Sequence, residues 1–99
     1  MKYKFLEHTA DVMFEAYGSS LNELFENCAL ATEETMINLK QIKQKIKKEV
    51  KLEDKSIENL LFNFLSELIY YKDAKLLMFS NIKVSIKKNK IYRLNAILH

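Results

Sequence analysis

The short segment Glu7-His8-Thr9-Ala10-Asp11 brings several chemically capable side chains together. Apolar and polar residues alternate on either side of it, over residues 2–7 and 12–17, and such alternation predicts two β-strands. The segment is too short for a crossover, so we expect the two strands to pair antiparallel with this segment as their connection. Functional groups are often displayed on such connections, which makes the segment the first candidate for a site.

Asp11 is the most suitable metal ligand in this segment, because Ca²⁺ and Mg²⁺ prefer hard oxygen donors. Calcium takes about 6–8 oxygens, so one carboxylate is not a complete site. Glu7 and Glu15 could lie nearby in a hairpin, but alternation alone does not show that they converge. His8 is a poor calcium ligand, and we expect it to hydrogen-bond locally and set the loop. Thr9 is expected to stabilise the turn through its hydroxyl.

His8 and Asp11 could instead act as an acid/base pair, which would make the protein a small enzyme. Neither a nucleophile nor a phosphate-binding loop accompanies the pair. The chain has a single glycine, Gly18, and no proline, so no glycine-rich phosphate loop can be formed. The acid/base interpretation therefore has weak support.

The composition predicts one globular domain over residues 1–99, with a small net charge of +3. No apolar run approaches the roughly 20 residues that a membrane helix needs, so no membrane partner is expected. A lone cysteine, Cys28, excludes an internal disulfide, which is typical of a reducing compartment. We therefore expect a cytoplasmic protein.

Two amphipathic helices are predicted. The first begins at the capping-box pattern Ser20-Leu21-Asn22-Glu23. Its apolar stripe consists of Leu21, Leu24, Phe25, Cys28, Ala29, Thr32 and Met36, with Glu26, Glu33 and Glu34 expected to face outward. The second helix is capped by Asp54 or Ser56. Its broad apolar face consists of Ile57, Leu60, Leu61, Phe64, Leu65, Leu68 and Ile69.

Between the helices lies a lysine-rich stretch, the basic segment Lys40–Lys51. Apolar residues alternate with polar ones at its end and predict a strand with one wet face. Its lysines can serve to blunt an exposed sheet edge. Alternatively, the protein is a small RNA- or protein-binding module without metal, in which the contacts are Lys43, Lys45, Lys47 and Lys48. No aromatic residues are interleaved there, so a base-stacking platform is missing.

The last two strand patterns, residues 82–86 and 91–98, are joined by a turn at Lys87–Lys90 and predict a second hairpin. The element order is strand-strand-helix-strand-helix-strand-strand. It predicts an α+β fold with two helices packed on a mostly antiparallel sheet. The chain stops at His99, inside an apparent strand whose second face carries Ile91 and Ile97. We expect a fragment of a longer protein, or a fold that a partner completes.

These motifs together resemble the archease family. The resemblance consists of His8-Thr9-Ala10-Asp11, then Ala16-Tyr17-Gly18, then the run Leu21–Ala29, and finally the leucine-rich helix Asn59–Tyr70. These motifs occur in the family's order and at its spacing along the whole chain. The first motif joined to its helix is fairly specific, whereas the second helix alone would be weak.

The resemblance implies a non-catalytic activator of the GTP-dependent RNA ligase that joins tRNA halves during splicing. Such a protein promotes guanylylation of the ligase and its multiple turnover, and it meets RNA through the ligase. The resemblance also implies a divalent-metal site, described as calcium, with Asp11 as one ligand. The family's second aspartate lies in a C-terminal segment, which also carries a lysine-containing strand. Neither has a counterpart in this chain, so the single archease-like domain is expected to be truncated there.

Overall fold

The computed structural model describes residues 1–6, 13–36, 46–75 and 77–99. Its elements, in chain order, are β1 (Tyr3–Leu6), β2 (Met13–Ala16), α1 (Leu21–Met36), β3 (Lys48–Asp54), α2 (Ile57–Lys75), β4 (Ile82–Lys88) and β5 (Tyr92–Leu98). This confirms the predicted order and the α+β class. Helix α2 continues through Lys75, beyond the predicted apolar face, with Lys72 and Lys75 in its last turn.

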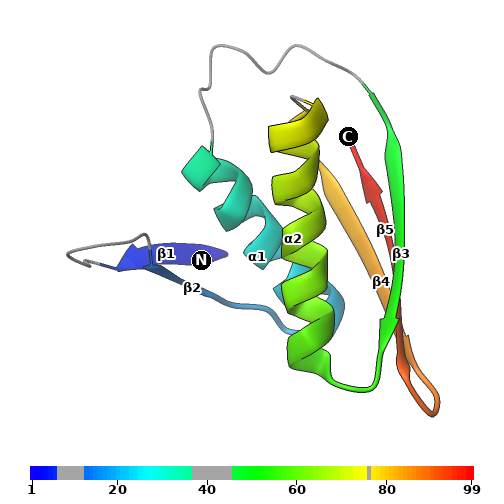
Figure 1. The fold of residues 1–99 in the computed structure, drawn as a ribbon. Helices are drawn as coiled ribbons and strands as arrows, with labels where there is room; N and C mark the ends of the chain where they lie inside the picture. The colour runs from blue at the N-terminus through cyan, green and yellow to red at the C-terminus, as the bar shows by residue number, and fades with distance from the viewer. Residues whose placement is uncertain (7–12, 37–45, 76) are drawn as a thin grey trace.

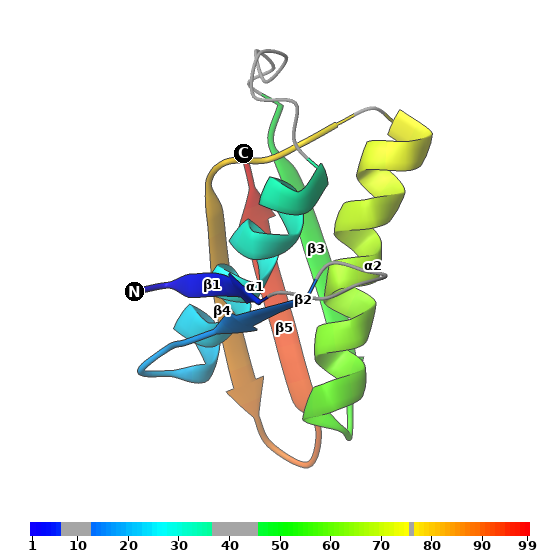
Figure 2. The same ribbon diagram turned by 90° about the vertical axis from the view of Figure 1, so that its left-hand side faces the viewer.

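The elements form three layers (Figure 1). The helices α1 and α2 make the middle layer, with the β1–β2 hairpin on one side and the sheet of β3, β4 and β5 on the other. The view from the hairpin side shows β1 and β2 lying in front of α1 (Figure 2). The strands thus form two separate antiparallel sheets, of two and three strands.

The three-stranded sheet has the order β3-β5-β4, so the last strand of the chain is its centre. β5 pairs antiparallel with both neighbours, with Ala96 opposite Val50 on one side and Val84 on the other. The predicted hairpin of β4 and β5 is confirmed, and its turn is closed by a bond from the Asn89 amide to the Ile91 carbonyl. Both β3 and β4 are therefore edge strands.

Helix α1 starts as its sequence predicts. The Glu23 amide donates to the Ser20 hydroxyl at 3.1 Å, and the Glu23 carboxylate accepts from both the amide and the hydroxyl of Ser19. These bonds satisfy amides that a helix N-terminus otherwise leaves free. Gly18 is required just before the cap, because a Cβ there would lie 2.4 Å from the Leu24 nitrogen.

Helix α2 is capped by Ser56, whose hydroxyl accepts from the Asn59 amide, while Asp54 accepts from the Ser56 amide. Its buried side chains are Leu60, Phe64 and Leu68. Ile69, predicted to lie on the same face, is instead 44% exposed, because the described elements cover α2 on the side that faces the sheet and α1.

The main core lies between the helices and the three-stranded sheet. Its largest fully buried side chains include Phe25 of α1, Phe64 of α2 and Phe79, which precedes β4. Phe25 and Phe64 stack with centroids 6.2 Å apart. Fully burying such a side chain contributes on the order of 1.5–3 kcal/mol, so these residues hold the helices against the sheet. Neither described helix is both long and apolar enough to cross a membrane.

Helix α1 also closes the outer edge of β4 with polar side chains. The Val84 amide donates to Glu26 at 2.8 Å, and the Ile86 amide donates to Asn22 at 2.7 Å. The expectation that Glu26 faces outward is therefore wrong. The carboxylate instead occupies the position that a neighbouring strand would otherwise fill, and so protects an edge that would be open to association.

A third side chain of this set, Glu33, holds the segment that leads into β4. It is only 2% exposed, which contradicts the expectation that it faces outward. Its Oε2 accepts from the Phe79 amide at 3.2 Å, while Oε1 has no hydrogen-bond partner among the described residues. Burial raises the pKa of Glu33 to about 7, and the bond from Phe79 partly opposes that rise. We call Asn22, Glu26 and Glu33 the polar seam.

The buried carboxyl of Glu33 predicts a stability that declines toward neutral pH. Its pKa is about 7 in the folded protein against an ordinary value of 4.5, so the folded state binds the proton more tightly. The contribution of Glu33 to the free energy of unfolding is fully present below about pH 4.5 and is lost as pH rises through about 7. The loss should be on the order of 3 kcal/mol.

Glu33→Gln keeps an acceptor oxygen for the Phe79 amide and removes the charge. We expect urea unfolding to show a flatter pH dependence for this variant than for wild type between pH 4.5 and 8. Glu26→Gln is the matched control, since Glu26 also accepts an amide bond from the same edge but is only partly buried. Identical pH slopes for wild type and Glu33→Gln would contradict the assignment.

Candidate functional site

Asp11, the predicted metal ligand, and His8 and Thr9, its predicted supports, lie in the connection between β1 and β2. His8, Thr9 and Asp11 fall within residues 7–12, outside the described residues, so their roles stay predictions. The strands on either side are described, with Leu6 opposite Met13 as the last pair before the connection. The antiparallel hairpin predicted from the alternation is therefore confirmed, and it is the frame that carries this segment.

Helix α1 holds the hairpin at two points. The Asn27 side chain is buried and donates from Nδ2 to the Tyr17 carbonyl at 2.6 Å, just after β2 ends. Near the end of α1, interaction with the Glu34 carboxylate raises the pKa of the Tyr3 hydroxyl of β1 to about 12, and burial and the negative charge of Glu34 add to that rise. One contact anchors each strand, so α1 fixes the position of the hairpin over the helix layer.

Glu15 is committed to its own strand and its neighbours. Its carboxylate lies 3.8 Å from the Lys4 amine on β1 and accepts from the Tyr17 hydroxyl at 2.7 Å. This bond to Glu15 raises the pKa of Tyr17. Since Glu15 already has two partners, nothing in the described hairpin directs it toward Asp11.

The described residues do not by themselves complete a metal site. They contain no group of three or more His, Cys, Asp or Glu side chains placed to hold one ion. A calcium site would therefore need Asp11 together with oxygens from outside the described part of the chain. Cys28 does not add a reactive group, because it is buried and burial raises the pKa of its thiol.

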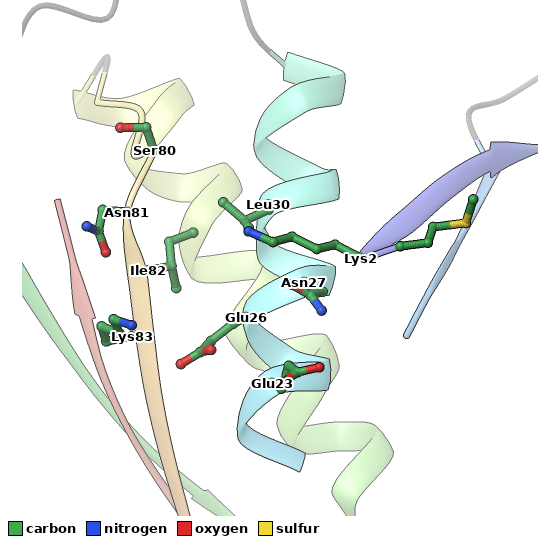
Figure 3. A pocket seen from close by; sticks show the side chains of 10 residues that line it. Lys2, Glu23, Glu26, Asn27, Leu30, Ser80, Asn81, Ile82 and Lys83 are labelled. Carbon is green, nitrogen blue, oxygen red and sulfur yellow. The ribbon is translucent and has the colours of Figure 1, made fainter. Parts of the chain in front are cut away.

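A polar pocket lies between the start of the chain, α1 and the start of β4 (Figure 3). It is lined by Met1, Lys2, Glu23, Glu26, Asn27, Leu30, Ser80, Asn81, Ile82 and Lys83. Three of its polar side chains already make structural bonds: Glu23 in the helix cap, Glu26 with Val84 and Asn27 with Tyr17. We therefore assign these lining groups to holding the layers together.

The basic segment is only partly described. Lys43 and Lys45 lie outside the described residues, whereas Lys47 is exposed and Lys48 begins β3. The predicted strand is confirmed as β3. Glu49 and Glu53 interrupt the lysines along it, and Glu53 pairs with Arg93 of β5 at 3.3 Å. This described part alternates in charge and does not form a uniformly basic surface.

Sequence reasoning missed the residues that position the hairpin and the sheet edge. Asn22, Glu26 and Glu33 share one face of α1 at 3.6 residues per turn, beside the apolar stripe. That spacing was a signal for a polar contact with another element. No comparable signal identified Asn27 or the pairing of Tyr3 with Glu34, because these contacts depend on how the hairpin lies on α1.

The chain matches known proteins over nearly its whole length. A model of the archease protein family matches residues 3–99. "Protein archease" of Thermococcus kodakarensis is 41% identical over 96 residues, which are 96% of this chain and 68% of that protein. "Protein archease" of Sulfurisphaera tokodaii is 39% identical over 90 residues, which are 91% of this chain and 65% of that protein.

"Protein archease" of Pyrobaculum neutrophilum is 38% identical over 98 residues, covering 98% of this chain and 67% of that protein. The chain thus spans about two thirds of the length of these curated relatives. The matches include the β1–β2 hairpin, both helices and the three-stranded sheet. The chain belongs to the archease family.

Proposed function

We propose that this protein activates a GTP-dependent RNA ligase that joins tRNA halves, by promoting guanylylation of the ligase and its multiple turnover. The protein itself is not the ligase, and its contact with RNA is made through the ligase in the cytoplasm. The observation that carries this proposal is membership of the archease family over residues 3–99. The first motif of that resemblance includes Asp11, which makes the β1–β2 connection the functional end of the molecule.

Asp11 is proposed as a ligand of a divalent cation, with Ca²⁺ the expected ion. A carboxylate oxygen suits such a hard cation, and bound calcium would supply fixed positive charge where the protein meets its partner. His8 and Thr9 are proposed to support the conformation of the connection. Oxygens from outside the described residues would have to complete the coordination.

In the described structure, α1 holds the two strands that flank this connection. Asn27 and Glu34 anchor the two strands of the hairpin to α1, which in turn is bonded to the edge of β4. A two-stranded hairpin alone is only marginally stable in water. The anchoring contacts therefore support the proposal that the connection is presented to the ligase in a defined position.

The activation is tested by mixing the purified chain with a GTP-dependent RNA ligase and measuring transfer of labelled GMP to the ligase. We expect wild type to raise the rate of guanylylation and the number of RNA joining events per ligase. Asp11→Asn keeps the size of the side chain and removes its charge, and it should lower the stimulation by on the order of tenfold. Asp73→Asn, an exposed change on α2, is the control.

Equal stimulation by wild type and Asp11→Asn would remove Asp11 from the function, and no stimulation by folded wild type would remove the activator role of this chain. Calcium binding is measured separately by isothermal titration calorimetry. Wild type should release or absorb heat on titration with Ca²⁺, and Asp11→Asn should weaken the binding. Stimulation that persists in a chelator, with no calorimetric signal, would exclude the metal while leaving activation intact.

Asn27→Ala tests whether the attachment of the hairpin to α1 is needed for stability and for ligase stimulation. The substitution leaves the Tyr17 carbonyl without its buried donor and should lower the free energy of unfolding by about 1–3 kcal/mol. Ligase stimulation should fall as well, at a temperature where the variant is still folded, because the β1–β2 connection is no longer held. Asn63→Ala, an exposed change of the same type on α2, should alter neither property. Full stimulation by folded Asn27→Ala would show that the anchor is unimportant.

A further inference from the structure

The outer edge of β3 carries backbone groups that no described residue pairs with. Asn81 and His99 exchange two backbone bonds, which fixes the pattern: odd-numbered residues of β5 bond β4, and even-numbered ones bond β3. In β3, therefore, Lys48, Val50, Leu52 and Asp54 point their amides and carbonyls toward β5. Those of Glu49, Lys51 and Glu53 point away from the sheet.

The two edges of this sheet are treated differently. On β4, side chains of the polar seam accept the outward amides of Val84 and Ile86. On β3, no hydrogen bond of that kind is made by the described residues. The strand is seven residues long and borders the molecule on its outer side (Figure 1). Such a free edge is a template for another strand.

Charge alternates along this edge. Lys47, Glu49, Lys51, Glu53 and Lys55 follow one another at every second position, and all five are exposed. Side chains two residues apart in a strand lie on the same face, so these residues form a single charged row with the signs plus, minus, plus, minus, plus. The row faces away from the helices, since the intervening Val50 is buried in the core.

We propose that a second copy of this chain pairs with β3, antiparallel and with Val50 opposite its own counterpart, to make a continuous six-stranded sheet across a two-fold axis. In this register Glu49 lies opposite Lys51 of the other copy, and Glu53 lies opposite Lys47. Odd residues meet odd residues, so the outward amides and carbonyls of both edges bond one another. Both of these facing pairs, Glu49–Lys51 and Glu53–Lys47, are oppositely charged, which favours pairing.

The same row disfavours the most obvious alternative. Full overlap of the two strands would place Lys51 opposite itself and Glu49 opposite Glu53, and like charges directly opposite destabilise a strand pair. The charged row therefore disfavours full overlap and favours registers offset by one residue. A register about Leu52 also pairs opposite charges, Glu49 with Lys55 and Lys51 with Glu53, and crosslinking distinguishes it from the proposed register about Val50. The charged side chains are free to pair across the two copies. Their present pairs, Lys51–Glu49 and Glu53–Arg93, join side chains that are about half exposed or more, and such exposed pairs contribute little.

The test is sedimentation of the full chain at increasing concentration, with variants of single charge sign. Lys47→Glu with Lys51→Glu makes the row from 47 to 53 wholly acidic, and Glu49→Lys with Glu53→Lys makes it wholly basic. We expect wild type to dimerise, each double variant alone to weaken dimerisation by roughly tenfold or more, and their equimolar mixture to recover it. Lys83→Glu with Lys87→Glu on β4 changes the net charge by the same amount as the acidic variant and should leave the dimer intact.

Carbodiimide crosslinking of wild type gives a readout that does not depend on how the variants fold. In an equal mixture of ¹⁵N-labelled and unlabelled protein, mixed-isotope products should join Glu49 to Lys51 and Glu53 to Lys47. A wild type that stays monomeric to its solubility limit overturns the proposal. So does a dimer that the row variants leave unchanged, or whose mixed-isotope crosslinks lie elsewhere. The proposed dimer does not depend on the proposed activation of the ligase, so a failure of either proposal does not affect the other.

Discussion

The edge of β4 and the segment that precedes it need hydrogen-bond acceptors, and helix α1 supplies them. A backbone amide buried without a partner is costly, so Val84, Ile86 and Phe79 each require an oxygen. Glu26, Asn22 and Glu33 provide these from one face of one helix. Bonds spread over three turns fix both the height of α1 along the strand and its rotation about its own axis. The rest of the arrangement follows from that placement.

With α1 fixed, the other layers are fixed through it. Its Phe25 stacks on Phe64 and so positions α2, while Asn27 and Glu34 hold the hairpin on the far side. Ala29 and Ala31, which point in nearly opposite directions from the helix axis, are both fully buried. Helix α1 is thus a central helix between two sheets. Among the described elements, β1 and β2 contact each other and α1, so the hairpin is joined to the three-stranded sheet by way of this helix.

Local patterns in the sequence were enough to predict the elements and their order. Alternation identified both hairpins, and the serine caps at Ser20 and Ser56 marked the starts of the helices. These local patterns were not enough to predict how much of α1 is buried. An apolar stripe indicates that one face of a helix packs against a neighbour, but it does not show what covers the other faces. Glu26 and Glu33 looked solvated for that reason. Their environment is set by β4, which lies some fifty residues later in the chain. The proposal that Asp11 binds a metal rests on the family resemblance, because periodicity does not indicate ligands.

The two edges of the three-stranded sheet are protected in different ways, by hydrogen-bond acceptors at β4 and by charge at β3. At β4 the polar seam accepts the outward amides of Val84 and Ile86, so this part of the edge is closed whatever its surroundings. At β3 the amides stay open and only charge restricts what can pair. A row of lysines alone would repel every copy of the chain in every register, whereas an alternating row repels some registers and attracts others. Specificity is a difference between competing arrangements, and repulsion in the unwanted one is part of it. An edge built in this way does not exclude strands in general; it selects a partner whose charges alternate in the opposite sense, and the chain itself, turned antiparallel about Val50, has that pattern.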